Sequence, residues 1–195
     1  CAVHELAIHQ LDVKNAFIYA PLAEEVYMHP HEEMHDSPGI ACLLLRSLYG
    51  LKQAPGNWNG HLPDFIIYLG FRQSSQDHCL YVHTIHGAVV FMVVFVDNIL
   101  LASRSDVALA KVKTAFQDRF TMTDEGLAQE FLGVRIIQRP GLVTLDQQHY
   151  CETITREFKR YIGRRNYSEV PMQANAELHA VFEATPEQAD WVARF

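Results

Sequence analysis

Hydrophobic and polar residues follow patterns typical of β-strands in several parts of the chain. Between Leu6 and Val13 the two kinds alternate, with Leu11 and Val13 on one face and Asp12 on the other. Ala88 to Phe95 is apolar throughout, as in a strand buried on both faces. Shorter segments of strand character are Glu24 to Met28, Ile40 to Leu45, Cys79 to Thr84 and Ile99 to Ala102. These patterns predict a sheet of short strands.

Three other segments place hydrophobic residues three or four positions apart, which predicts amphipathic helices. The first is Pro55 to Leu69, the second starts at the N-cap Ser105, and the third follows Asp146 and ends near Gly163. Pro63 lies inside the first segment and is expected to break that helix. The residues expected to be buried are Trp58, Leu62, Phe65, Leu69, Leu109, Val112, Phe116, Phe120, Tyr150, Ile154 and Phe158.

The order of these elements predicts the fold class. Phe131 to Ile137 and Leu142 to Leu145 flank Pro140-Gly141 and are expected to form a hairpin. Strand, helix, strand pair, helix, hairpin and helix then follow one another, which predicts an α+β fold with helices packed on a mostly antiparallel sheet.

Composition and charge narrow the function classes. The chain has 195 residues, 49% of them hydrophobic, which is enough for a core. A net charge of -7 argues against a simple electrostatic binder of nucleic acid. The charge is uneven, however: residues 1–103 carry -6, residues 104–165 carry +3 and residues 166–195 carry -4. The basic excess peaks in a stripe that is either a polyanion-binding surface or a solvated helix face: Arg156, Lys159, Arg160, Arg164 and Arg165.

The remaining composition indicates a soluble intracellular protein without a cysteine-based site. The four cysteines are scattered and form no CxxC pair, so neither a zinc site nor a disulfide framework is expected. No segment resembles a signal peptide or a membrane span. The sequence begins with Cys1, from which we expect a piece of a longer polypeptide. His29, His31 and His35 form an alternative metal site, although such a loop is more often only solvated.

Two aspartates are the first candidates for chemistry. Asp12 lies within the first strand, and Asp97 lies in a tight turn between two strongly apolar strands. An aspartate in a turn is commonly only a turn former. If the Asp12 strand lies beside this hairpin, however, two carboxylates converge at one sheet edge, an arrangement that suits Mg²⁺ and phosphoryl transfer.

Longer motifs surround both aspartates and carry a family resemblance. They are QLDVKNAFIYAPLAEEVYMHP (Gln10 to Pro30), SLYGLKQAPGNW (Ser47 to Trp58), DHCLYV (Asp77 to Val82), FVDN (Phe95 to Asn98) and FLGVRI (Phe131 to Ile136). In order and spacing the chain resembles, over roughly residues 5 to 172, the reverse transcriptase of copia-type LTR retrotransposons. The resemblance implies a polymerase palm, with an antiparallel sheet and helices on one face, and the start of a thumb.

The resemblance also implies roles for individual residues. Asp12, Asp97 and Asn98 match the catalytic positions, and Asp12, Val13 and Asp97 match the ligands of two Mg²⁺ ions, or of Mn²⁺ in their place. Phe17 matches the aromatic residue that excludes ribonucleotides, with a plain core phenylalanine as the alternative. Lys52 and Gln53 match nucleotide contacts, although Lys52 alone would be a surface charge. Positions that match contacts to nucleic acid are Phe131, Leu132, Gly133, Arg156, Lys159 and Arg160.

The implied organisation and partners are those of a polyprotein. We expect a palm over residues 1–137, a primer-gripping hairpin and the start of a thumb over 138–172, and a connection or tail over 173–195. The implied partners are a primed RNA or DNA template, a deoxynucleoside triphosphate (dNTP), and the fingers, RNase H and integrase parts of a Pol polyprotein; no membrane is involved. The implied location is the cytoplasm, within virus-like particles, and the nucleus.

Some residues depart from the family pattern. The family box is usually YVDD, whereas this chain has FVDN, so that Asn98 removes one carboxylate. Gly56 stands where the family usually has arginine. From the resemblance we also expect the upstream fingers region to be missing. Two functions follow: an RNA-directed DNA polymerase fragment that transfers nucleotides to a primer 3′-OH, or a catalytically silent palm with at most weak nucleic-acid binding. We expect the isolated chain to extend a primed template poorly or not at all.

Overall fold

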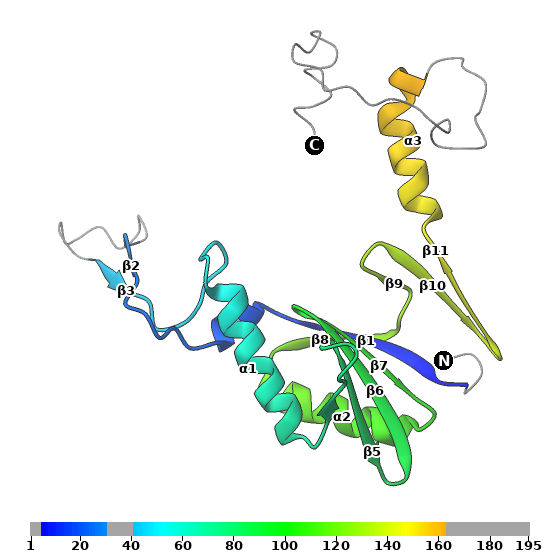
Figure 1. Ribbon diagram of the computed structural model, residues 1–195, viewed down its shortest axis with the longest axis horizontal. Coiled ribbons are helices and arrows are strands. Elements are labelled where there is room, and N and C mark those ends of the chain that lie inside the picture. Colours follow the sequence, from blue (N-terminus) through cyan, green and yellow to red (C-terminus); the bar gives the residue numbers. More distant parts are fainter. Residues whose placement is uncertain (1–4, 31–40, 163–195) are drawn as a thin grey trace. The chain divides into compact units, whose positions relative to one another are not determined.

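The computed structural model describes residues 5–30 and 41–162 (Figure 1). Contacts divide the chain into two compact units, residues 1–150 and 151–195. The predicted palm and thumb boundaries at residues 137 and 172 stay predictions.

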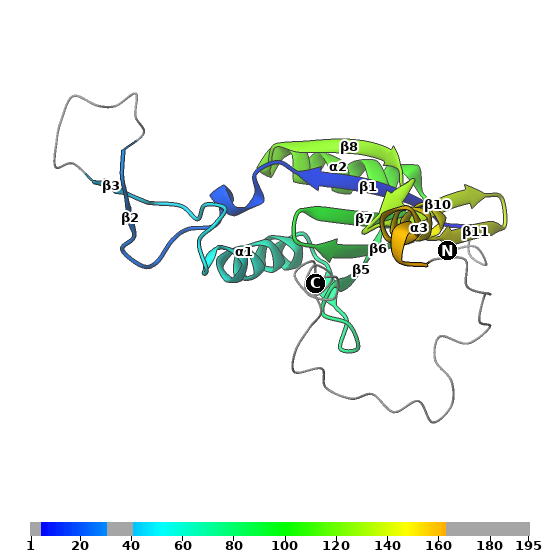
Figure 2. The same cartoon turned by 90° about the horizontal axis from the view of Figure 1, so that it is seen from above.

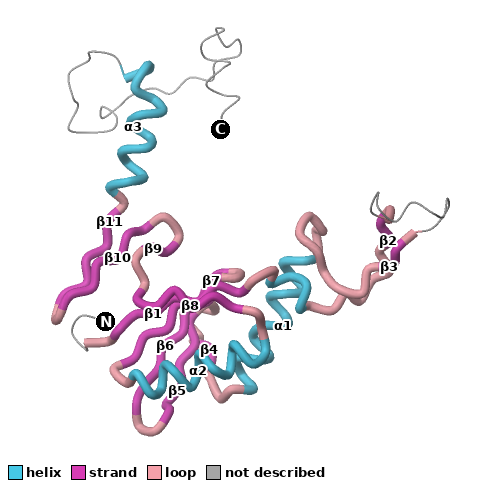
Figure 3. The backbone as a smooth tube through the Cα atoms, turned by 180° about the vertical axis from the view of Figure 1, so that it is seen from behind, coloured by secondary structure: helices cyan, strands magenta, loops and turns pink. Residues whose placement is uncertain are grey.

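A six-stranded sheet forms the centre of the first unit, and every neighbouring pair of its strands is antiparallel. In spatial order the strands are β4 (Arg72–Gln73), β5 (Leu80–Ile85), β6 (Ala88–Phe95), β7 (Asn98–Ser103), β1 (Ala7–Val13) and β8 (Met122–Leu127). Together with the helices, this sheet confirms the α+β prediction (Figure 3). The edge strand β8 was not predicted, because its residues are polar and mostly exposed.

Two helices, α1 (Ala54–Tyr68) and α2 (Asp106–Arg119), share one core with the sheet. The α2 helix begins as predicted, since the Ser105 side chain accepts a hydrogen bond from the Ala108 N–H. The core brings together apolar residues from both helices and from one face of the central strands: Trp58, Leu62, Ile66, Leu109, Val112, Phe116, Leu11, Val13, Met92 and Leu101. Both helices therefore cover the same face of the sheet.

The expectation that Pro63 breaks the first helix is wrong. The α1 helix runs through Pro63 and ends at a glycine with positive φ, as predicted for Gly70. Pro63 removes one backbone donor, but Asn59, four residues earlier, is exposed, so water can satisfy its carbonyl. Burial of Trp58, Leu62 and Ile66 on either side outweighs the lost hydrogen bond.

The opposite face of the sheet carries a second, smaller sheet at one end. It consists of β11 (Leu142–Asp146), β10 (Val134–Arg139) and β9 (Glu130–Phe131). The β10–β11 hairpin is confirmed, but the predicted single strand from Phe131 to Ile137 is wrong. Leu132 and Gly133 have φ of 51° and 75°, so that the chain turns back between β9 and β10.

Short elements complete the first unit. A 3-10 helix, η2 (Ala16–Tyr19), follows β1. The predicted strands around residues 24–28 and 40–45 are reduced to the pair β2 (Tyr27–Met28) and β3 (Cys42–Leu43). Ile40 lies outside the described residues.

The third helix, α3 (Gln148–Ile162), confirms the predicted span (Figure 2). Its expected burial is wrong for Tyr150 and Ile154, which are exposed, while Phe158 is half-buried. A hydrophobic stripe indicates that a helix can bury one face, but it does not supply the partner. Among the described helices, none is long and apolar enough to cross a membrane.

A strained two-residue turn, Val96-Asp97, joins β6 to β7. Val96 has a φ of 55°, which is unfavourable for a β-branched residue. Its carbonyl accepts a hydrogen bond of 2.7 Å from the indole N–H of the buried Trp58. Helix α1 therefore helps to hold this turn in its strained conformation.

A polar cluster ties α2 to the sheet beside the core. The Lys113 ammonium lies 2.8 Å from His9 Nδ1 and 2.8 and 2.9 Å from the carboxylate oxygens of Asp124. Burial, followed by the charge of Lys113, lowers the pKa of His9. Burial would raise the pKa of Asp124, but hydrogen bonds from Lys113 and from the Gly126 N–H lower it overall. The lowered pKa favours the neutral imidazole, and Nδ1 is then the acceptor, because the Lys113 ammonium can only donate.

We expect the free energy of unfolding to fall as the pH drops below 6.5, the ordinary pKa of histidine. The pKa of His9 is lowered in the fold, so the unfolded chain protonates His9 more readily than the folded chain does. The contribution of neutral His9 to stability is therefore present above pH 6.5 and is lost as the pH falls through the folded pKa. His61 acts in the same direction, because burial and then Arg119 and Arg46 lower its pKa. In urea unfolding measured from pH 7.5 to 5, His9→Gln should flatten the dependence, whereas the exposed His78→Gln should not. Equal slopes in both variants would contradict this assignment.

Val96→Gly should be less destabilising than Val89→Gly by about 1–2 kcal/mol, because glycine relieves the strain at position 96 but only weakens the strand at position 89. Val89 is a matched control: it lies on β6, the strand that leads into the turn, and is 42% exposed, against 41% for Val96. Urea unfolding of the two variants measures the difference. Equal losses would mean that the turn stores no strain.

Candidate active site

The sheet register brings the two candidate aspartates together. Asp12 on β1 is the direct cross-strand partner of Asn98 on β7. The next residue, Val13, donates its backbone N–H to the Asp97 carbonyl at 2.8 Å. The strand that carries Asp12 thus lies beside the β6–β7 hairpin, and both aspartates lie at the same end of the sheet.

Side-chain alternation places Asp12 on the face of the sheet that the helices leave open. Leu11 and Val13 are buried in the core with α1 and α2, so Asp12 and Gln10 lie on the other face. Asn98 shares this face as the partner of Asp12. A substrate can therefore approach Asp12 without displacing the core.

Each carboxylate has partners within the site. Lys14 Nζ lies 2.6 Å from Asp12 Oδ2. Asn98 Nδ2 donates to Asp97 Oδ1 at 3.1 Å, and Gln10 Nε2 donates to Asn98 Oδ1 at 3.5 Å. The asparagine thus replaces a charge repulsion at this position with a hydrogen bond to the neighbouring carboxylate.

Tyr49 also belongs to this site, and the sequence patterns did not single it out. Its hydroxyl donates to Asp97 Oδ2 at 3.4 Å, and its ring centroid lies 4.4 Å from that of Phe17. Burial, then the charge of Asp97 and its hydrogen bond, and then Asp12 raise the pKa of Tyr49. The hydroxyl is therefore a donor at neutral pH. The signal was its place in SLYGLKQAP, but only the fold brings it to Asp97.

The three residues expected to contact the nucleotide differ in burial and in their distance from the aspartates along the contact network. Phe17 is only 7% exposed and belongs to the core, and it reaches the site through Tyr49. Lys52 is exposed, and Gln53 is the N-cap of α1 without a side-chain capping bond. Within the described residues, neither Lys52 nor Gln53 makes a side-chain hydrogen bond to Asp12, Asp97 or Tyr49.

A cavity of about 410 Å³ lies behind the strained turn, between α1 and the β5–β6 strands. Its lining includes Trp58, Leu62, Tyr81, Phe95 and Val96. Trp58 and Val96 both line this cavity, so the Trp58 hydrogen bond to the Val96 carbonyl joins its helix side to the turn.

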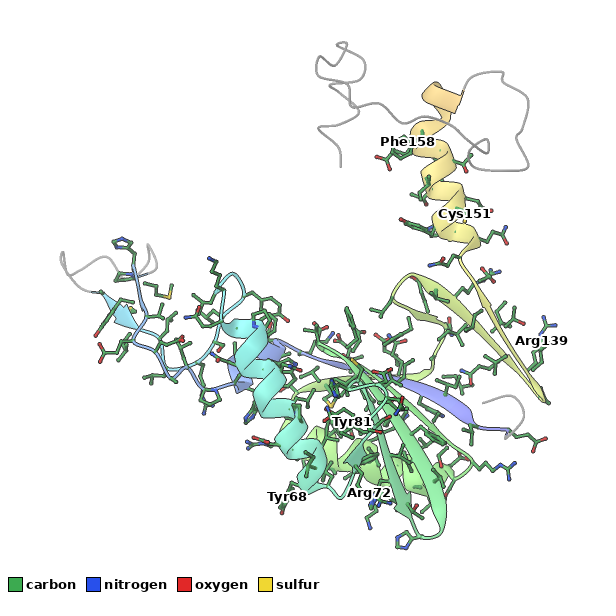
Figure 4. All side chains as sticks on the ribbon, viewed as in Figure 1. Tyr68, Arg72, Tyr81, Arg139, Cys151 and Phe158 are labelled. Carbon is green, nitrogen blue, oxygen red and sulfur yellow. The ribbon has the colours of Figure 1, made fainter. Side chains whose placement is uncertain are left out.

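The expected nucleic-acid contacts lie on two elements. Phe131, Leu132 and Gly133 form the β9–β10 turn, in which Leu132 is 53% exposed. Arg156 is exposed on α3, which also contains Lys159 and Arg160, but the side chains of these two residues lie outside the described part of the chain. Figure 4 shows Cys151 and Phe158 on the same helix. Arg164 and Arg165 are outside the described residues.

The donor set fits a magnesium ion held jointly with a substrate. Mg²⁺ binds oxygen ligands and is commonly held by one or two carboxylates plus substrate phosphates. Asp12 and Asp97 supply the carboxylates, and Val13, the residue after Asp12, is tied to the Asp97 carbonyl by its backbone N–H. Asn98 adds no charge, and Lys14 already neutralises part of Asp12. Among the described residues no cluster of three His, Cys, Asp or Glu could hold a metal alone, and of the three candidate histidines only His29 is described.

Comparison with known proteins identifies the family. The family model for reverse transcriptase (RNA-dependent DNA polymerase) matches residues 1–174. The chain is 35% identical over 145 residues to the retrovirus-related Pol polyprotein from transposon RE2 of Arabidopsis thaliana, covering 73% of this chain and 10% of that protein. It is 32% identical over 159 residues to the corresponding polyprotein from transposon TNT 1-94 of Nicotiana tabacum, covering 79% and 12%. The chain thus spans about a tenth of the length of these relatives. It belongs to the reverse transcriptase (RNA-dependent DNA polymerase) family and corresponds to part of the reverse transcriptase domain of a retrotransposon Pol polyprotein.

Proposed function

We propose that this chain is the palm, with the start of the thumb, of an RNA-directed DNA polymerase that adds deoxynucleotides to a primer paired with an RNA or DNA template. The observation that carries this proposal is the convergence of Asp12 and Asp97 at the open end of the sheet. The matching relatives are Pol polyproteins, which is consistent with a function exerted together with other Pol parts.

Asp12 and Asp97 would hold Mg²⁺, with the Val13 carbonyl as a further ligand. When bound, the ion supplies charge stabilisation to the reacting phosphoryl oxygens. The Tyr49 hydroxyl orients the Asp97 carboxylate through its hydrogen bond. The Tyr49 ring packs against the Phe17 ring, so that the two aromatic side chains lie side by side at the site. Lys14 adds positive charge beside Asp12, and the exposed Lys52 lies three residues after Tyr49 in the sequence; such positive charge favours a triphosphate.

Asn98 supports a second candidate function, a silent palm that binds primed template without extending it. Its amide donates to Asp97 Oδ1, so one carboxylate oxygen has a partner before any cation binds. Two carboxylates also attract cations less strongly than three. Both functions share the binding surface and differ only in catalysis, so activity measurements separate them.

Metal binding is expected to require both aspartates. Asp12→Asn and Asp97→Asn should each weaken the binding of Mn²⁺, used as a paramagnetic substitute for Mg²⁺, roughly tenfold or more in the presence of dNTP. Titration followed by electron paramagnetic resonance of free Mn²⁺ measures this directly. Asp106→Asn, at an exposed aspartate in the first turn of α2, is the matched control and should bind as the unmodified chain does. Equal Mn²⁺ affinity in all variants would show that the metal does not bind at Asp12 and Asp97.

Catalysis is expected to depend on position 98. The unmodified chain should extend a primed template poorly, whereas Asn98→Asp, placed after a fingers segment from a relative, should gain about a hundredfold in rate. The same fusion with Asn98 retained is the control that isolates position 98. A Mg²⁺-dependent primer-extension assay gives the result. Rapid synthesis by the unmodified chain would overturn the silent-palm alternative, and no rescue in the fusion would show that the defect extends beyond the third carboxylate.

A further inference from the structure

The second sheet is anchored to the strand that carries Asp12 by one side-chain amide. Gln138 on β10 accepts a hydrogen bond from the Ile8 N–H at 2.9 Å and donates to the Ile8 carbonyl, also at 2.9 Å. It donates to the Ala128 carbonyl as well, at 3.1 Å. The two bonds with Ile8 join residues 130 positions apart in the sequence. Gln138 therefore connects the β9–β11 sheet to β1 directly.

The amide takes the place of a missing strand. The β1–β8 pairing ends at His9 and Leu127, one residue short of Ile8. Beyond that pair the chain leaves the sheet, and only the Ala128 N–H returns to the Ile8 carbonyl, at 2.9 Å. Without Gln138, the part-buried Ile8 N–H would have no partner in its ladder, which is unfavourable. The side chain thus continues the ladder where backbone pairing stops.

A small apolar cluster fixes the same junction. Ile8, Ala102, Ala128 and Ile136 are buried together, with Phe131 packed against them. Phe131 begins the β9–β10 turn, so this cluster places the turn on the open face of the sheet. Apolar packing has little directional preference, whereas the Gln138 hydrogen bonds to the Ile8 backbone fix the point at which β10 meets β1.

The junction and the candidate metal site lie on the same face of one strand. Ile8 and Asp12 are four residues apart on β1, a separation of about 13 Å along the strand. Strand β1 is paired with β7 over the whole interval and with β8 from His9 onward, so it spaces the two sites. A displacement of β10 at Ile8 would move the Phe131–Gly133 turn relative to Asp12.

We propose that Gln138 is a positioning residue for the primer terminus: its amide fixes the Phe131–Gly133 turn relative to Asp12 by joining β10 to the backbone of β1. This inference rests on the proposed function and takes the Phe131–Gly133 turn, which matches a nucleic-acid contact of the family, as the part that holds the primer end. The Gln138 amide makes its hydrogen bonds with the Ile8 and Ala128 backbone, so in this proposal it acts through the position of β10. Figure 4 shows the adjacent Arg139 at the far end of the β10–β11 hairpin.

The anchor can be tested without catalysis. In Gln138→Met, which is close in volume but lacks the amide, hydrogen exchange of the Ile8 amide should accelerate about tenfold or more, while that of the fully buried Leu101 should not change. Gln138→Glu keeps the acceptor for the Ile8 N–H and should give a smaller effect. Gln117→Met, on the exposed side of α2, is the matched control. Unchanged exchange at Ile8 in Gln138→Met would overturn the anchor.

Primer placement needs a second measurement. A primer ending in 4-thiothymidine, annealed to its template, should crosslink to residues 131–133 of the unmodified chain. The yield should fall roughly tenfold in Gln138→Met at unchanged affinity for the primed template, because a displacement of about 1 Å is enough to lose reactive geometry. A faster Ile8 exchange with unchanged crosslinking would reduce Gln138 to a structural role and overturn the proposal. If the unmodified chain binds no primed template at all, the proposed function fails, which the exchange data distinguish from failure of the anchor.

Discussion

The antiparallel register between β1 and β7 is the constraint on which the candidate site depends. A slip of one residue would turn Asp12 toward the helices and Leu11 toward solvent. Burial of Leu11 and Val13 against α1 and α2 opposes that slip, and the Val13 N–H bond to the Asp97 carbonyl closes the correct pairing at its end. Apolar burial on one face therefore decides which carboxylates stand on the other.

Strand β1 takes part in three interactions, which are distributed over its two faces. On the helix face, His9 contacts Lys113 of α2 beside the core residues. On the open face, Asp12 lies at one end and Ile8, held by Gln138, at the other. The helices, the second sheet and the candidate metal site thus all contact one central strand. Because β1 is paired with both β7 and β8, the positions of these three parts depend on one another.

Strong periodicity made much of this fold predictable, whereas the less regular parts depended on tertiary contacts. The apolar run of β6 and the capped start of α2 at Ser105 carry their own local signals. The edge strand β8 does not, because it is polar and bulged where Gln10 and Leu11 pair with it. The positive φ of Leu132 could not be predicted from the sequence either, since leucine has no preference for that conformation. Asp12 and Asp97 stood out through their motifs, but the contact between Tyr49 and Asp97 arises only when the chain folds.

The asparagine at position 98 links stability to chemistry at this site. Three neighbouring carboxylates would repel one another unless cations were bound. With Asn98, the Gln10, Asn98 and Asp97 side chains form a continuous hydrogen-bonded series, and Lys14 neutralises Asp12. The two aspartates therefore have hydrogen-bond and ion-pair partners even without a metal. The same partners reduce the negative electrostatic potential that would attract a cation. For the proposed metal-dependent function, an arrangement that stabilises the site in this way would weaken the electrostatic basis of catalysis by the same interactions.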